Sequence, residues 1–347
     1  MERKMQISVQ KKRQFLLGMV ISLLCLGGMF WVIKPAEIAE AIQQSDPRYL
    51  LGTAVYLIIY LFLRAVRWRY LLGNHIPQAK LLHIQNVGQM LTQLLPFRLG
   101  DVARAVLVGQ QPGLSVPQGI TTMVVERLLD MLLMVFLLPL ALLQIDALPT
   151  WLRQAALFSG MATVGLIVFL MVMANKRPLA HKLLAWLASK LAWLQSKKLH
   201  KQLDSLLDGL HAFTRWRTAL TLLGLSVLTW LPVVLAYNAA LQAVHLPPSL
   251  LTATFIMIAG AFAVAAPSSP GQIGVFHMGI IAAMTTLGQP AEAAASLAVL
   301  YHALNFLLMV LTGIVGLNSI QISFPRLFQS LGFQWRSTPP ELTDPIS

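Results

Sequence analysis

LLPFRLGD at residues 94–101 and AAPSSPGQ at residues 265–272 each place a proline four residues before a glycine within apolar sequence. A proline interrupts helical hydrogen bonding, and backbone groups freed inside a bilayer must be buried in protein or line a cavity. We therefore interpret these two stretches as broken, re-entrant membrane segments in opposite halves of the chain.

The apolar segments around the two stretches give them opposite surroundings. The first stretch follows a segment expected to descend to the cytoplasm and precedes one that rises, and the second has the reverse surroundings. Paired broken segments in halves of opposite topology indicate an inverted repeat with a transport site near the membrane midplane. The alternative is coincidence, because proline and glycine are common in membrane helices.

The composition is that of an integral membrane protein. Only 11% of the 347 residues are charged, and the mean hydropathy is +0.68. Apolar segments near the ~20 residues that a crossing helix needs recur along the chain. We expect an all-α, polytopic integral membrane helical bundle with about eight membrane segments plus a re-entrant segment, in an inverted-repeat architecture. The expected membrane segments are 15–33, 49–66, 117–143, 152–174, 218–240, 249–266, 273–288 and 293–317, and the more polar re-entrant segment is 81–95.

The basic residues predict the orientation of the chain, because cytoplasmic loops retain Lys and Arg. With the N-terminus inside, the segments 1–13, 64–104, 174–217 and 318–347 hold 22 of the 26 Lys and Arg residues. We therefore expect a multi-pass protein of the plasma (inner) membrane with both termini in the cytoplasm. No folded basic module surrounds these residues, so nucleic acid is not an expected partner.

We expect residues 1–320 to form a single transmembrane domain. Residues 179–213 within it have an apolar face and a basic remainder, which indicates a cytoplasmic amphipathic helix on the inner leaflet or, alternatively, a solvated basic loop that sets topology. Residues 321–347 are proline-rich, and we expect a disordered cytoplasmic tail. The single cysteine, Cys25, excludes a disulfide framework, and we expect no cofactor and no metal.

Charged residues follow the first break at helical spacing. Arg98, Asp101 and Arg104 are three residues apart, so they share one face of a helix that begins there. A helix N-terminus flanked by two guanidinium groups suits a phosphate. These residues are therefore candidate ligands of an anionic headgroup.

Glu126, Arg127 and Asp130 lie within the next apolar segment. Charges at membrane depth cost roughly 2.5–3.5 kcal/mol each on insertion scales, so they usually pair or line a polar cavity. We expect these carboxylates to hold the arginines of the first break. The alternative is that Glu126 and Arg127 lie at the cytoplasmic boundary and extend to the interface.

Further candidates lie on the second apolar segment and in the second half. Arg64 and Arg67 are either site residues or interface anchors, and Arg64 is nearer the bilayer centre. In the second half, polar and glycine residues surround the break, and two polar residues share a face of the last apolar segment. These candidates are Ser268, Ser269, Gly271, Gln272, Gly274, His277, His302 and Asn305. A buried histidine is alternatively a hydrogen-bonded packing element.

Four motifs together resemble the transmembrane, flippase-like domain of lysylphosphatidylglycerol synthases and their stand-alone relatives. They occur in the family's order over nearly the whole chain. The motifs are Arg64 with RW at 67–68, LPFRLGD at 95–101 with Arg104, ER at 126–127 with Asp130, and PSSPGQIGVFH at 267–277.

The resemblance implies a lipid translocase, not an enzyme, which moves aminoacylated phospholipids or polyprenyl-phosphate-linked sugars between leaflets. Many relatives carry a glutamate where this chain has His277, which puts a role for that carboxylate in doubt here. The sequence lacks the soluble aminoacyl-transferase domain of the full-length synthases. We therefore expect no synthesis of lysylphosphatidylglycerol.

Three functional hypotheses follow. The first is a transporter that binds an anionic phospholipid or a polyprenyl-phosphate lipid between the two broken segments. The second is an intramembrane lipid-phosphate enzyme, although neither an HExxH motif nor a GxSxG elbow is present. The third is an accessory subunit that recruits a cytoplasmic glycosyltransferase through the basic region 174–217.

Overall fold

The computed structural model describes residues 42–95, 99–142, 150–176, 216–264 and 270–322, with a few isolated positions outside these ranges. All regular elements in these ranges are helical, and no strand occurs within them. The elements are α3 (Pro47–Leu71), α4 (Gln78–Leu94), α5 (Leu99–Gly109), α6 (Val116–Leu142), α7 (Thr150–Asn175), α10 (Trp216–Ala243), α11 (Leu250–Ala263), the 3-10 helix η4 (Pro270–Gln272), α12 (Val275–Thr286) and α13 (Ala291–Ser319).

Several expectations concern residues outside these ranges. They are the first apolar segment, most of the amphipathic segment 179–213, the tail after residue 322, and the site candidates Arg98, Ser268 and Ser269. These expectations stay predictions.

The sequence determines where the helices begin. The Asp46 side chain accepts a hydrogen bond from the backbone N–H of Arg48 at 2.8 Å, and Pro47 occupies the first turn of α3. Both features are typical of a helix N-terminus. Ser249 caps α11 in the same way, by accepting from the backbone N–H of Thr252 at 3.2 Å.

Among the described helices, α3, α10 and α13 are long and apolar enough to cross a membrane. The expected segments 249–266 and 273–288 correspond to α11 and α12, which have 14 and 12 residues. Such helices rise only about 21 and 18 Å, which is short of the ~30 Å hydrocarbon core. The described residues therefore support a helical membrane protein with fewer clear spans than the expected eight.

Large apolar side chains cover the outside of the bundle. Leu51, Phe62 and Leu311 are each about half exposed or more, at 67%, 48% and 50%. Exposed apolar surface on this scale marks a contact with a membrane or a partner. Lipid contact explains it on helices of this length and composition.

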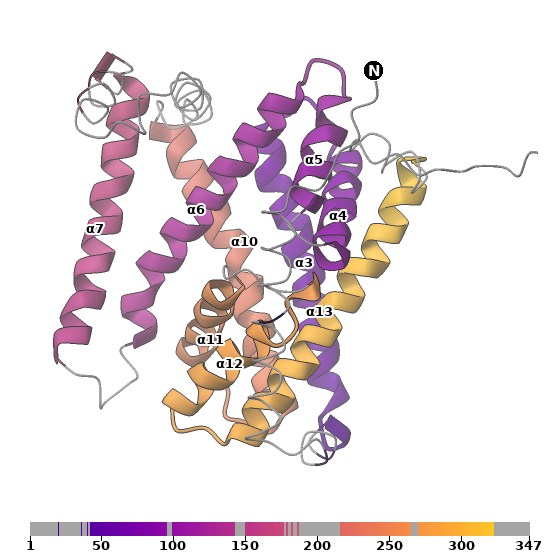
Figure 1. Ribbon diagram of the computed structural model, residues 1–347, viewed down its shortest axis with the longest axis vertical. Helices are drawn as coiled ribbons and strands as arrows, with labels where there is room; N and C mark the ends of the chain where they lie inside the picture. The colour runs from indigo at the N-terminus through magenta and orange to yellow at the C-terminus, as the bar shows by residue number, and fades with distance from the viewer. Residues whose placement is uncertain are drawn as a thin grey trace, which may run out of the picture.

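The elements form two sets with the same order: a long helix, two short helices and a long helix. The first set is α3 to α6, and the second is α10 to α13. The long helices α3 and α10 pack along each other, α4 packs along α13, and α11 packs against α6. In Figure 1 the α4/α5 pair occupies the upper half of the bundle and the α11/α12 pair the lower half, with α7 at the edge beside α6.

The described residues next to the two breaks come together inside the bundle. Helix α4 ends at Leu94, immediately before the first break, and contacts η4, which follows the second break. A Cβ on Gly271 would lie 3.8 Å from the carbonyl oxygen of Gln93. The residues on either side of the two breaks thus come from opposite ends of the bundle and meet inside it.

Two glycines allow α4 and α5 to cross at backbone contact. A Cβ on Gly100 would lie 2.0 Å from the carbonyl oxygen of Gly88 and 2.5 Å from the backbone nitrogen of Thr92. A Cβ on Gly88 would lie 2.1 Å from Cγ of Arg104. The glycines therefore set both the separation of the two helices and the position of the Arg104 side chain.

We expect Gly100→Ala to destabilise the protein by about 1–3 kcal/mol, because the added methyl group overlaps backbone atoms that cannot rotate away. Thermal unfolding of the purified protein in detergent measures the effect. The matched control is Gly224→Ala on α10, where a Cβ would meet no atom within 4 Å. Equal melting temperatures for the two variants would contradict the close crossing.

Candidate functional site

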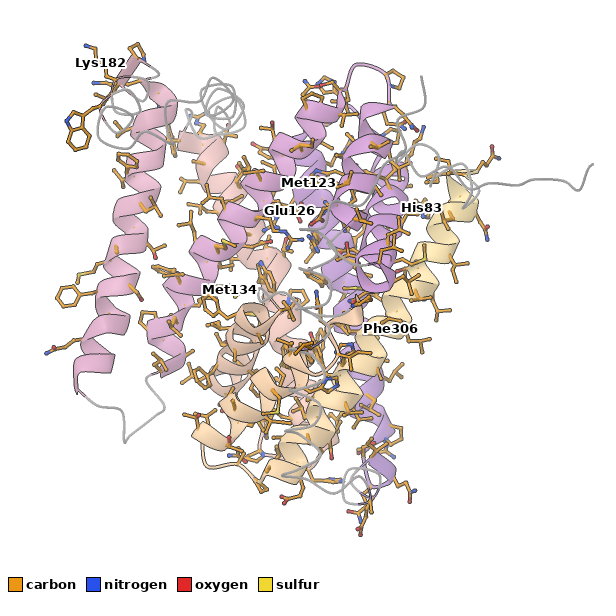
Figure 2. All side chains as sticks on the ribbon, in the orientation of Figure 1. His83, Met123, Glu126, Met134, Lys182 and Phe306 are labelled. Atoms are coloured by element: carbon orange, nitrogen blue, oxygen red, sulfur yellow. The ribbon has the colours of Figure 1, made fainter. Side chains whose placement is uncertain are left out.

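A buried carboxylate on α6 is the centre of the ionic cluster. The Glu126 side chain is 1% exposed, and its oxygens lie 2.6 Å from Nε of Arg64, 3.0 Å from Nη2 of Arg104 and 3.6 Å from Nη2 of Arg67. Figure 2 places Glu126 inside the bundle, with nitrogen-bearing side chains gathered beside it. Because Arg64 and Arg67 belong to α3 and Arg104 to α5, this one group joins three helices.

Asp130, one turn further along α6, extends the cluster to α10. Its Oδ1 lies 2.7 Å from Nη1 of Arg67 and accepts a hydrogen bond from Nε1 of Trp230 at 2.8 Å. The same Nη1 of Arg67 donates to Ser226 at 3.2 Å. Asp130 and Arg67 therefore connect the first set of helices with the second.

Asp101 and Arg127 form a more exposed pair at 3.4 Å. Oδ1 of Asp101 also lies 3.7 Å from Nη1 of Arg104, so the two residues share a helix face as their spacing predicts. The side chains of Asp101 and Arg127 are 24% and 37% exposed. The burial of Glu126 does not fit the alternative that it extends to an interface, whereas Arg127 is partly exposed.

Among the described residues, the carboxylates of α6 hold Arg104 of the first break and also two arginines of α3. Glu126 pairs with Arg64 and Arg67 of α3 and with Arg104, while Arg98 lies outside the described ranges. A sequence shows which charges need partners, whereas the choice among partners depends on how α3 and α5 cross α6. Arg67 next to Trp68 does not indicate this pairing in the sequence, because arginines that anchor a helix at the membrane interface also stand beside aromatic residues.

The cluster has one more positive than negative charge among its described members. Arg64, Arg67, Arg104 and Arg127 face Asp101, Glu126 and Asp130. Within the described ranges Nη2 of Arg64 is buried without a hydrogen-bond partner. The guanidinium of Arg104 lies 4.1 Å over the ring of Trp68, which satisfies one of its faces.

A cavity of about 180 Å³ lies beside the cluster, between the two short-helix pairs. Its lining includes five candidates from the sequence: Arg64, Arg127, Gln272, His302 and Asn305. Eight further polar or aromatic lining residues were not among the candidates: Tyr60, Gln89, Thr92, Gln93, Trp230, Tyr237, Phe276 and Tyr301. The sequence did indicate Gln89 and Gln93, because the segment 81–95 is more polar than the other expected membrane segments.

Arg67, Asp101, Arg104, Glu126 and Asp130 do not line the cavity. They position the residues that do, through the ion pairs around Glu126. Glu126, for example, holds the Nε side of the Arg64 guanidinium, while Arg64 itself reaches the cavity.

The second break approaches the cavity through residues in left-handed backbone conformations. Gly271 has φ 71°, Gly274 has φ 86°, and Gln272 between them has φ 58°. Glycine adopts this region without a steric penalty, which explains two of the three positions. The resulting turn places the Gln272 side chain in the cavity lining and ends where α12 begins.

His277 and His302 were expected to line the same cavity. His302 does, and its ring stacks on the ring of His277 at a centroid distance of 4.9 Å and an angle of 17°. The backbone N–H of Gly274 donates to Nδ1 of His277 at 3.2 Å, so a neutral His277 carries its proton on Nε2. His277 thus supports the wall of the cavity and does not line it.

The chain matches the family described as "Lysylphosphatidylglycerol synthase TM region" over residues 15–313. Glycosyltransferase AglD of Haloferax volcanii is 23% identical over 338 residues, which cover 88% of this chain and 54% of that protein. A UPF0104 membrane protein of Methanothermobacter thermautotrophicus is 24% identical over 309 residues, which cover 84% of this chain and 89% of that protein. The chain thus spans about half the length of the Haloferax relative. No solved structure matches the chain.

We expect Glu126→Gln to cost about 3–5 kcal/mol of stability, because it leaves buried guanidinium groups without their shared counter-charge. Unfolding of the purified variant in detergent, followed by helical circular dichroism, measures the loss. The control is Glu292→Gln, which removes an exposed carboxylate from the first turn of α13. A Glu126 variant as stable as this control would show that the ion pairs contribute nothing.

Proposed function

The chain belongs to the lysylphosphatidylglycerol synthase transmembrane-region family, and on that premise we propose that it is a lipid translocase. It binds the anionic headgroup of a phospholipid or a polyprenyl-phosphate lipid where its two broken segments meet. It then releases the headgroup to the other leaflet without changing it chemically.

The observation that carries the proposal is the cationic cavity lined by residues of both sets of helices. Arg64 and Arg127 line it, and the cluster behind them has an excess positive charge. Guanidinium groups bind phosphate oxygens with short, directional hydrogen bonds, and they do so more strongly away from bulk water. A phosphate that enters the cavity would compensate the excess charge and satisfy Nη2 of Arg64.

The order of the helices supports a mechanism of alternating access. We propose that α3 to α6 and α10 to α13 are inverted repeats, because their elements have the same order and the pairs α4/α13 and α11/α6 are equivalent contacts. Transporters with inverted repeats move one repeat against the other around a site near the midplane. The headgroup site would then open first to one leaflet and then to the other.

We further propose that the protein lies in the plasma membrane with both termini in the cytoplasm, as the distribution of basic residues predicts. A cytoplasmic glycosyltransferase that binds the region 174–217 is a proposed partner. The match to a longer relative named as a glycosyltransferase is consistent with that partner.

We expect Arg127→Gln to slow translocation of acyl-labelled phosphatidylglycerol in proteoliposomes about ten- to hundredfold, as the loss of a charge-assisted hydrogen bond predicts. Quenching of the label in the outer leaflet reports the rate. Arg127 is a suitable target because its side chain is 37% exposed and its removal should leave the fold intact.

Arg217→Gln is the matched control, because Arg217 is an exposed arginine outside the cavity lining. The proposal fails if the Arg127 variant moves lipid as fast as this control. Mass spectrometry of the lipid after the assay separates transport from an enzymatic reaction, since a translocase returns the lipid unchanged.

A further inference from the structure

Amide side chains form a row along one face of α4. Gln85, Gln89 and Gln93 are four residues apart, and they are 0%, 6% and 8% exposed. Gln89 and Gln93 line the cavity, whereas Gln85 donates to the carbonyl oxygen of Leu61 at 2.9 Å. A buried amide is costly unless it is hydrogen-bonded, so the two lining amides require a partner.

Each of the two lining amides has one buried polar atom without a hydrogen-bond partner. Nε2 of Gln89 and Oε1 of Gln93 are buried and have no hydrogen-bond partner within the described ranges. Nε2 of Gln93 approaches Sδ of Met309 at 3.1 Å, and this contact fixes the orientation of the amide because sulfur accepts a hydrogen bond and the amide oxygen cannot donate one. Two residues of the cavity wall, a helical turn apart, therefore carry one unpaired donor and one unpaired acceptor.

A hydroxyl group matches this pair, because it both donates and accepts a hydrogen bond. An ammonium group donates only, and away from bulk water it would need a carboxylate as its partner. No carboxylate lines the cavity among the described residues, while Arg64 and Arg127 do. An aminoacylated headgroup would thus place its positive charge beside two guanidinium groups.

The size of the cavity limits the headgroup further. Its volume of about 180 Å³ is below the roughly 300–1,000 Å³ of pockets that enclose drug-sized ligands. It accommodates a phosphate with a small polar substituent, and an oligosaccharide or a lysyl extension would have to reach beyond it.

Building on the translocase function, we propose that Gln89 and Gln93 form a hydroxyl-recognition subsite next to the phosphate site. The preferred lipid carries one phosphate and a small hydroxyl-bearing group, of which glycerol is the simplest. The subsite discriminates against aminoacylated headgroups, through the absent counter-charge and the two arginines.

Proteoliposomes that contain acyl-labelled phosphatidylglycerol, phosphatidic acid or lysyl-phosphatidylglycerol test the subsite. Wild-type protein should move phosphatidylglycerol at least about tenfold faster than the lysyl ester. Gln89→Leu and Gln93→Leu should each slow phosphatidylglycerol about three- to tenfold, the range for one hydrogen bond, and leave phosphatidic acid unaffected. The control is Gln242→Leu on α10, a half-buried glutamine outside the cavity lining.

A second variant does not depend on the folding of the leucine variants. Gln93→Glu keeps the shape of the side chain and adds the missing carboxylate, so it should shift the preference toward the lysyl ester. Soluble glycerol 3-phosphate at millimolar concentration should not slow phosphatidylglycerol. If it competed as well as the lipid, the ligand would be a free polyol phosphate and the assignment to a lipid would be wrong.

The outcomes separate the two proposals. If none of the lipids moves, the translocase function fails. If phosphatidylglycerol and its lysyl ester move at equal rates, or if the glutamine variants do not alter their ratio, the translocase function stands and the subsite is refuted.

Discussion

Charges buried among apolar helices need partners at short range, and the packing of this structure depends on that requirement. Glu126 provides the counter-charge of Arg64, Arg67 and Arg104, and so fixes how α3, α5 and α6 pack. Asp130 continues the network to α10. The cavity lies beside these ion pairs, so the interaction that holds the first set of helices together also makes the cavity cationic.

The broken segments meet a second requirement, which concerns the backbone. Inside a bilayer an interrupted helix is tolerated only where protein or a polar cavity surrounds it. In this chain the residue that precedes the first break, Gln93, approaches Gly271 of the second stretch, and α4 contacts η4. Gln93 and Gln272 both line the polar cavity, so it receives side chains from next to both breaks.

Apolar runs located most helices within a few residues, because a membrane helix is a long, almost uninterrupted apolar segment. They also located α11 and α12, but they left open whether these helices span the bilayer, because the composition resembles that of a span while the helices have only 14 and 12 residues. Spacing along one helix predicted that Asp101 and Arg104 lie together. No such rule predicts contacts between distant helices, so the pairing of Arg64 with Glu126 and the stacking of Tyr237 on Tyr301 became visible only in three dimensions.

The long-range pairing of Arg64 with Glu126 also has a consequence for biosynthesis. The two residues are 62 positions apart, so the ribosome delivers α3 with Arg64 and Arg67 before either carboxylate of α6 exists. At insertion costs of roughly 2.5–3.5 kcal/mol per charge, α3 alone is a poor substrate for lateral release from the translocon. At about 5–20 residues per second, α6 follows within seconds. The two helices should therefore enter the lipid together, as a neutralised unit, and α3 should wait at the channel until its partner emerges.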